Sequence, residues 1–82
     1  MSYVVYILKS GKDQKRYIGL TKDLRRRLSE HNSGLVKSTK NRRPFNLIYQ
    51  EEFNSKTEAL KREKFFKTYN GKRFLHKRLK SY

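Results

Sequence analysis

Glu63 is the residue whose position in the sequence most directly suggests chemistry. It lies in a segment with apolar residues at helical spacing, and steps of four and then three from Ala59 reach Glu63 and Phe66 on one helix face. A carboxylate on a face that packs against a sheet loses much of its hydration, so it is expected to be paired, protonated or bound to a cation. The ordinary alternative is a salt bridge with an arginine, or an edge position that water still reaches.

Four further residues carry groups that could act on a phosphate or on water: Tyr6, Tyr17, Arg27 and His31. Each has an ordinary explanation when taken alone, since tyrosine is common in strands and a histidine is favoured at the C-terminal end of a helix. Their joint placement separates the two interpretations. A helix that directly follows the strand of Tyr17 can bring Arg27 and His31 to one edge of the sheet, and Glu63 must then come from a different helix.

Three strands are expected to support these side chains. β-Branched and aromatic residues over 3–8 predict a strand that is covered on both faces, and 16–20 predicts its hairpin partner. Strict alternation of apolar and polar residues over 45–50, opened by Pro44, predicts the third strand.

The first helix is expected between the second and third strands. Leucines four residues apart predict a helix over 21–33, with Thr21 as its N-cap and Gly34 just beyond its end. The basic stretch 37–43 has no periodicity and is expected to be an exposed loop.

Two more helices are expected after the third strand. Ser55 and Glu58 match a capping box that opens a helix over 55–69, which Asn70-Gly71 should end. A last short helix is predicted over 72–81. The fold class is therefore α+β, a three-stranded, mainly antiparallel sheet flanked by helices in the order ββαβαα.

Composition and charge limit the classes of function. The chain has 82 residues and a formal net charge of +15, from 22 Lys and Arg against seven Asp and Glu, which indicates a polyanionic partner, most simply nucleic acid. No apolar run approaches the ~18 residues of a membrane span. The four glycines are too scattered for a nucleotide-binding loop. The absence of cysteine excludes disulfides and thiolate metal sites, and the chain is expected to be cytoplasmic.

Five blocks of sequence carry a resemblance to a known family. They are Val4–Tyr6, Tyr17–Gly19, Asp23–Asn32, Arg43–Tyr49 and Glu58–Lys67. In this order they resemble the GIY-YIG nuclease superfamily, and more closely its small stand-alone bacterial members, the YhbQ-like group. Because the blocks cover nearly the whole chain, we expect a single GIY-YIG-like domain over 1–82.

The resemblance assigns a role to each candidate residue. It implies that Tyr6 and Tyr17 are the two motif tyrosines, that Arg27 and His31 are the helix residues of the site, and that Glu63 holds the metal ion. Three features depart from the family pattern: Val4 and Val5 replace the glycine and isoleucine of the motif's name, Leu20 replaces a lysine of some members, and Asn70 follows Glu63 by only seven residues.

A hydrolytic mechanism follows from these assignments. One Mg²⁺ or Mn²⁺ held by Glu63 would polarise the phosphate, and a single carboxylate with several waters suits Mg²⁺. Arg27 would bind the nonbridging oxygens through its planar guanidinium. Tyr17 would act as the general base on water, a role for which a phenol with a pKa near about 10 needs a nearby cation. Tyr6 and His31 would orient the water or the phosphate, with His31 as the second choice of base.

The sequence thus predicts a metal-dependent endonuclease that acts on DNA rather than RNA, by structure-selective or partner-directed cleavage. The alternative is a basic nucleic-acid-binding module that keeps the fold without cutting. In either case the backbone phosphates would be held without reading of the bases. The residues expected on this binding surface are Thr39, Lys40, Asn41, Arg43, Lys72, Arg73 and Lys77.

Overall fold

The computed structural model describes residues 2–80, so positions 81 and 82, predicted to lie at or beyond the end of the last helix, are outside the described residues. The elements follow the predicted order, with a short 3-10 helix added before the third strand. They are β1 (Tyr3–Ser10), β2 (Arg16–Thr21), α1 (Leu24–Ser33), η1 (Lys40–Arg42), β3 (Phe45–Phe53), α2 (Lys56–Phe66) and α3 (Tyr69–Arg78).

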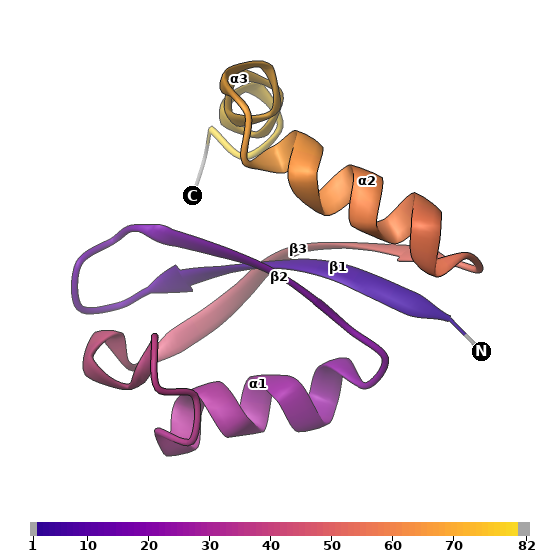
Figure 1. The fold of residues 1–82 in the computed structure, drawn as a ribbon. Helices are drawn as coiled ribbons and strands as arrows, with labels where there is room; N and C mark the ends of the chain where they lie inside the picture. Colours follow the sequence, from indigo (N-terminus) through magenta and orange to yellow (C-terminus); the bar gives the residue numbers. More distant parts are fainter. Residues whose placement is uncertain (1, 81–82) are drawn as a thin grey trace.

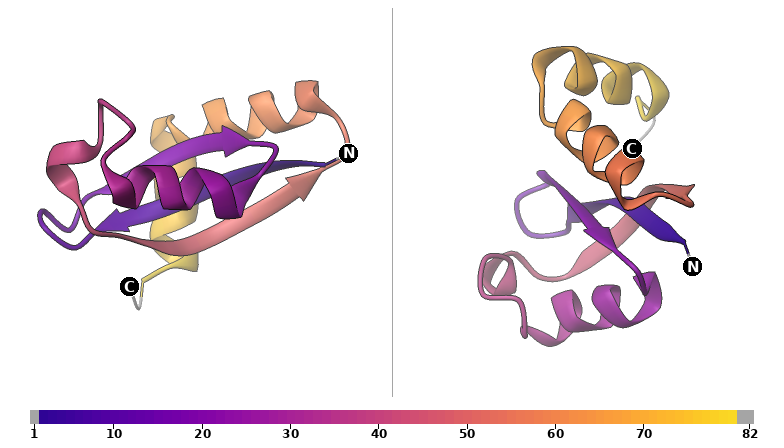
Figure 2. Two further views of the ribbon diagram at one scale, coloured as in Figure 1. Left: turned by 90° about the horizontal axis from the view of Figure 1, so that it is seen from below. Right: turned by 45° about the vertical axis from the view of Figure 1, so that its right-hand side comes forward.

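The sheet is antiparallel throughout and has the strand order β2-β1-β3. α1 covers one face of the sheet, and α2 covers the other with α3 packed beyond it, as Figure 1 and the right-hand view of Figure 2 show. The predicted α+β class and the order ββαβαα are therefore confirmed.

β1 is the central strand, and its side chains pack into two separate hydrophobic cores, one on each face of the sheet. Val5 and Ile7 pack with residues of α2 and α3, whereas Val4, Tyr6 and Leu8 pack with residues of α1 and β3. All five are nearly or completely buried, which is why this strand is apolar on both of its faces. The candidate site residue Tyr6 therefore belongs to the core beneath α1.

The start of α1 differs from the prediction. Asp23 rather than Thr21 is the N-cap, and its side chain accepts a hydrogen bond from the Arg26 N–H. Thr21 is the last residue of β2, where it pairs with Val4, and its hydroxyl accepts a hydrogen bond from the Asp23 N–H instead. The predicted end of the helix is confirmed, because Gly34 adopts a left-handed conformation with φ of 81°.

The junction of α2 and α3 also differs from the prediction. Asn70 and Gly71 do not end a helix but lie inside α3, whose N-cap is Thr68. A side chain at position 71 would overlap the carbonyl group of Phe65, so this glycine allows the two helices to approach closely. The sequence around a glycine does not distinguish one that ends a helix from one that allows two helices to pack closely, which is why the predicted helix end was wrong here.

Candidate active site

The ring of Tyr6 lies over the backbone of Gly19 on the neighbouring strand. The two residues pair across β1 and β2, and a Cβ atom added to Gly19 would collide with the ring and hydroxyl of Tyr6. The glycine thus leaves the volume into which the tyrosine extends. As a result, a side chain that starts on the central strand reaches towards the edge of the sheet while remaining only 1% exposed.

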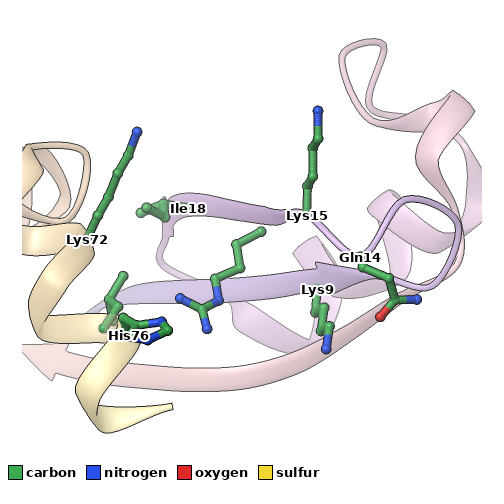
Figure 3. Close-up of a pocket in the computed structure, with 8 residues that line it drawn as sticks. Lys9, Gln14, Lys15, Ile18, Lys72 and His76 are labelled. Atoms are coloured by element: carbon green, nitrogen blue, oxygen red, sulfur yellow. The ribbon is translucent and has the colours of Figure 1, made fainter. Parts of the chain in front are cut away.

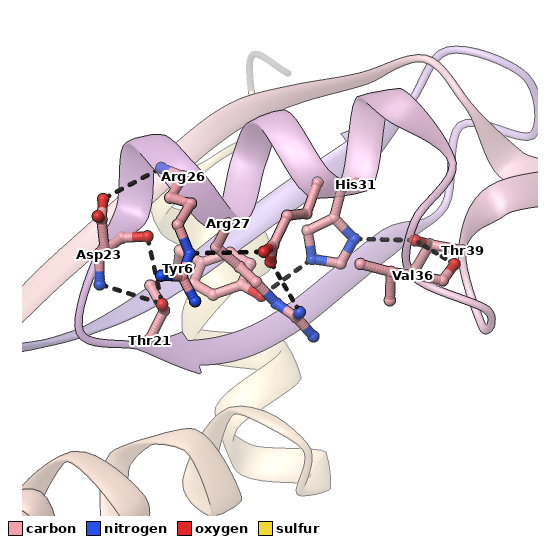
Figure 4. Close-up of polar contacts among 9 residues, drawn as sticks. Tyr6, Thr21, Asp23, Arg26, Arg27, His31, Val36 and Thr39 are labelled. Carbon is pink, nitrogen blue, oxygen red and sulfur yellow. Dashed lines mark hydrogen bonds and ion pairs between the residues drawn. The ribbon is translucent and has the colours of Figure 1, made fainter.

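A chain of hydrogen bonds runs from this tyrosine through α1 into the following loop (Figure 4). The Tyr6 hydroxyl lies 3.0 Å from His31 Nε2, and His31 Nδ1 lies 2.8 Å from the Thr39 hydroxyl. The Thr39 hydroxyl donates its proton to the Val36 carbonyl, so it accepts from the Nδ1–H of His31. The Nε2 atom is then the acceptor, and Tyr6 donates to it.

Tyr17 completes an aromatic group around this histidine. Its ring centroid lies 4.9 Å from that of His31 in an edge-to-face arrangement and 6.4 Å from that of Tyr6. Tyr17 is half-buried and comes from β2, an edge strand, so its hydroxyl is nearer to solvent than that of Tyr6. The three rings therefore form a wall at one edge of the sheet.

Arg27 brings a positive charge to the same place. It lies on α1 within hydrogen-bonding reach of the Tyr6 hydroxyl, a contact that raises the pKa of Arg27. Its guanidinium also donates to Glu30 at 3.1 Å. The Tyr17 side chain makes a further and smaller contribution to the raised pKa of Arg27. A hollow of about 380 Å³ opens beside Arg27 between α1 and the end of β2.

Burial sets the protonation states of the inner pair. It raises the pKa of Tyr6 above 10.0, although the contact with Arg27 acts in the opposite direction. It lowers the pKa of His31 below 6.5, and the nearby Arg27 charge lowers it further. Tyr6 therefore keeps its proton and His31 is neutral at pH 7, in agreement with the direction of their hydrogen bond.

Glu63 approaches from the helix on the other side of the sheet. It lies on α2 between the fully buried Ala59 and Phe66, and its own side chain is 18% exposed. Burial is the main cause of the raised pKa of Tyr6, and the negative charge of Glu63 is the smallest of the contributions to it.

The ion-pair partner of Glu63 is a lysine rather than the arginine considered in the ordinary alternative. Lys67 Nζ lies 3.3 Å from the carboxylate, one helical turn away, and the lysine side chain is 56% exposed. Exposed pairs at this spacing contribute only about 0.3–0.5 kcal/mol. The ion pair with Lys67 therefore holds the Glu63 carboxylate only weakly.

The donor set at Glu63 fits a hard cation that keeps most of its water. Within residues 2–80, no three His, Cys, Asp or Glu side chains gather to enclose a metal ion. Mg²⁺ is commonly held by one or two carboxylates and several waters, whereas zinc sites use three or four protein ligands. Glu63 alone is thus compatible with Mg²⁺ or Mn²⁺ but not with a closed zinc site.

The residues expected on the binding surface fall into two exposed groups and one exception. Lys40, Asn41 and Arg43 are exposed in and next to η1, beside α1, whereas Lys72, Arg73 and Lys77 are exposed on α3. Thr39 is the exception and corrects the expectation of an exposed loop. It is 0% exposed, because its hydroxyl is taken up by His31 and Val36. No signal in the aperiodic stretch 37–43 marked this burial.

The chain belongs to the GIY-YIG family: the family model described as the GIY-YIG catalytic domain matches residues 2–80. This is a nuclease domain, and GIY-YIG nucleases act on nucleic acid and generally depend on a divalent metal ion. The resemblance drawn from the five blocks of sequence is therefore confirmed. In addition, no helix within residues 2–80 is long and apolar enough to cross a membrane.

Within this family the chain is similar to UPF0213 proteins. It is 46% identical over 74 residues to a UPF0213 protein of Staphylococcus saprophyticus, with 89% of each chain covered. It is 47% identical over 75 residues to one from Staphylococcus aureus, with 90% of each covered. The solution NMR structure of a UPF0213 protein from Bacillus halodurans is 38% identical, has a TM-score of 0.60, and is matched over 96% of this chain and 86% of that one.

Proposed function

We propose that this protein is an endonuclease that hydrolyses phosphodiester bonds in DNA with one Mg²⁺ or Mn²⁺ ion. The observation that carries the proposal is the grouping of Tyr6, Tyr17, Arg27 and His31 at the β2 edge, together with the largely buried carboxylate of Glu63 on α2. The exposed cations available for binding would hold phosphates without reading bases, which favours selection of DNA by its structure or by a partner.

In this proposal Tyr17 takes the proton from the attacking water. It is the tyrosine at the edge strand, and Arg27 is placed so that a phenolate formed at Tyr17 is stabilised by the guanidinium charge. Arg27 also binds a nonbridging oxygen of the phosphate, since a guanidinium has several donors in one plane.

Tyr6 and His31 have a supporting role in the same proposal. His31 is 0% exposed and both of its ring nitrogens are hydrogen-bonded, so it has no free nitrogen with which to accept a proton from water. We therefore assign His31 to holding the Tyr6 hydroxyl in place, rather than to the role of second base. Tyr6 in turn presents its oxygen to Arg27 and fixes the position of that guanidinium.

Glu63 is the residue that would hold the metal ion. When bound, the ion supplies positive charge that stabilises the negative charge developing on the phosphate. Lys67 is exposed and can swing away from the carboxylate, which leaves Glu63 free to bind the cation.

A nicking assay tests the proposal. Wild-type protein with Mg²⁺ or Mn²⁺ is incubated with plasmid, branched and single-stranded DNA and with a matched RNA, and cleavage is compared with that of Glu63→Gln. Glu52→Gln is the matched control, because it makes the same change on an exposed residue of β3. We expect cleavage of DNA by the wild type and by the control, and none by Glu63→Gln. Equal cleavage by all three proteins would indicate contamination and would end the assignment.

One observation favours the alternative of a binding module without catalysis. Glu63 has an ion-pair partner within the chain, which is the arrangement expected of a carboxylate with a structural role. The substitution Lys67→Gln distinguishes the two functions. It should leave cleavage intact or increase it if Glu63 holds a metal ion, whereas a binding module shows no cleavage and loses only helix stability.

A further inference from the structure

A groove with cationic walls lies on the face of the sheet opposite to Tyr17. It has a volume of about 460 Å³ and runs between the β1–β2 hairpin and α3. In Figure 3, Lys72 of α3 and Lys15 of the hairpin lie on either side of Ile18. The lining residues on which the argument depends are Lys9, Lys15, Arg16 and Ile18 of the hairpin and Lys72 and Leu75 of α3.

The positive charges of the groove are uncompensated. Lys9, Lys15, Arg16 and Lys72 take part in none of the ion pairs found within residues 2–80. Among residues 2–80, no Asp or Glu side chain lines the groove. Four unpaired cations that line one groove repel one another, so this arrangement favours the binding of a polyanion.

The floor of the groove is apolar. Ile18 and Leu75 belong to the core that packs beneath α2 and α3, and they form the base between the charged walls. An apolar floor with lysines and an arginine along the rims suits a sugar-phosphate backbone, which has apolar sugar edges and charged phosphates. It does not resemble a site for a small anion, which would require donors converging on one point.

The groove and the candidate active site are on opposite faces of the same edge strand. Successive residues of a strand point to opposite faces, so β2 presents Tyr17 to the α1 side and Arg16 and Ile18 to the α3 side. Because β2 is an edge strand, no further strand separates the two surfaces. A nucleic acid that passes over this edge can touch both of them.

We propose that this groove binds the phosphate backbone of the substrate at a distance from the bond that is cut, so that the substrate crosses the β2 edge. The second part of this inference rests on the proposed function, whereas the binding of nucleic acid in the groove does not. The consequence for the substrate is that it must extend beyond the nucleotides around the scissile bond. An oligonucleotide too short to reach over the edge would occupy only one of the two surfaces.

The salt dependence of binding tests the groove. The affinity for a DNA duplex of about 20 base pairs is measured over a range of salt concentrations, where each phosphate contact adds about 0.9 to the slope. We expect Lys15→Gln/Lys72→Gln to lower the magnitude of the slope by about 1.8 relative to wild type, with weaker binding. These two lysines are exposed, so the fold should tolerate glutamine at both positions.

The matched control is Lys56→Gln/Lys61→Gln, which removes the same charge from exposed residues of α2 that do not line the groove. Lys56 starts α2 at the end of the sheet away from the hairpin (Figure 1). The control should keep the wild-type slope. A slope unchanged in the groove variant, or lowered equally in both variants, would overturn the inference, the latter because net charge alone would then explain binding.

A cleavage assay on the same variants shows whether the groove or the proposed nuclease activity is the part that fails. If the groove variant lowers the slope while neither wild type nor Glu63→Gln cuts DNA, the groove stands and the nuclease assignment falls. If cleavage depends on Glu63 but the groove variant binds and cuts like wild type, the nuclease assignment stands and the groove is overturned.

Discussion

Thr39 fixes the direction of the hydrogen-bond chain on which the site is built. Its hydroxyl lies 2.8 Å from His31 Nδ1 and 3.4 Å from the Val36 carbonyl, an arrangement in which it donates to the carbonyl and accepts from the Nδ1–H. That assignment makes Nε2 an acceptor and Tyr6 a donor. A fully buried threonine thus sets the direction in which Tyr6 donates its hydrogen bond.

Replacing Thr39 by valine should therefore destabilise the protein and disturb His31. Valine fills the same space but leaves the buried Nδ1–H without an acceptor, which costs about 1–3 kcal/mol in free energy of unfolding. Urea unfolding measures the loss of stability, and the ¹⁵N chemical shifts of the His31 ring report whether its proton stays on Nδ1.

Thr39→Ser is the matched control for this prediction. It keeps the hydroxyl and removes only a buried methyl group, at a cost of about 1 kcal/mol. Serine should keep the wild-type ring shifts of His31. Identical shifts in the valine and serine variants would show that the hydroxyl does not set the tautomer.

The stability of the protein should fall when the pH drops below the ordinary pKa of histidine. The pKa of His31 in the folded state is below 6.5 because burial and the charge of Arg27 disfavour its protonated form. The unfolded chain then takes up the proton first, so the contribution is complete above pH 6.5 and is lost as the pH falls. For one proton the slope is at most about 1.4 kcal/mol per pH unit.

Unfolding free energies between pH 7.5 and 5 check this expectation. The pH dependence in this range should shrink in His31→Gln and persist in His76→Gln, since His76 is an exposed residue of α3. Asp13 does not interfere, because its hydrogen bond with Arg42 lowers its pKa from 3.8 to about 2 and its own contribution is lost only below that range. An equal pH dependence in both variants would rule out His31 as the source.

At the scale of elements, the contact between α2 and α3 depends on the absence of one side chain. Alanine is a better helix former than glycine by about 0.5–1 kcal/mol, so propensity alone predicts that Gly71→Ala stabilises α3. A Cβ at this position would overlap the Phe65 carbonyl, however, and overpacking costs about 1–3 kcal/mol. We expect the steric cost to win and the thermal midpoint to fall.

Asn70→Ala is the control for this prediction, because it raises helix propensity at an exposed neighbouring position. It should leave the thermal midpoint unchanged or slightly higher. A Gly71→Ala protein that is as stable as Asn70→Ala would mean that α3 can shift away from α2 without loss.

The elements that the sequence predicts correctly are those whose signals are local. The capping box of Ser55 and Glu58 opens α2 as expected, with the Ser55 side chain accepting from the Glu58 N–H. Thr21 is an acceptable N-cap on local grounds, but its pairing with Val4 of β1 keeps it in β2, and Asp23 caps α1 instead. Tertiary contacts therefore set the boundaries that local patterns left open.

The same distinction applies to the site. The inward position of Glu63 follows from helix periodicity, and its side chain is indeed mostly buried. The burial of Thr39 does not follow from any pattern around it, because it arises when the loop after α1 folds back and brings Thr39 against His31 of that helix. The groove between the hairpin and α3 is equally non-local, since its two walls are far apart in the sequence.

At the scale of the whole molecule, the net charge of +15 should make stability increase with salt. Screening shortens the Debye length from about 30 Å at 0.01 M to about 10 Å at 0.1 M, which weakens the repulsion within the folded protein. The five ion pairs of the described residues weaken as well, but exposed pairs contribute only about 0–1 kcal/mol each. Repulsion should therefore dominate.

The thermal midpoint measured at low and at moderate sodium chloride concentration checks this balance. A gain of about 1 kcal/mol corresponds to a rise of roughly 4–8 °C for a chain of this size. A midpoint that falls with added salt would show that the ion pairs outweigh the repulsion.

The fit of the Tyr6 ring over Gly19 has a consequence for how this sequence can vary. The ring occupies the volume that the glycine leaves, so position 19 cannot gain a side chain while the Tyr6 ring stays in place. In a library randomised at both positions and selected for folding, glycine should accompany every aromatic residue at position 6. Larger residues should be tolerated at position 19 only beside small ones at position 6. The residues at positions 6 and 19 should thus covary, although they belong to different strands.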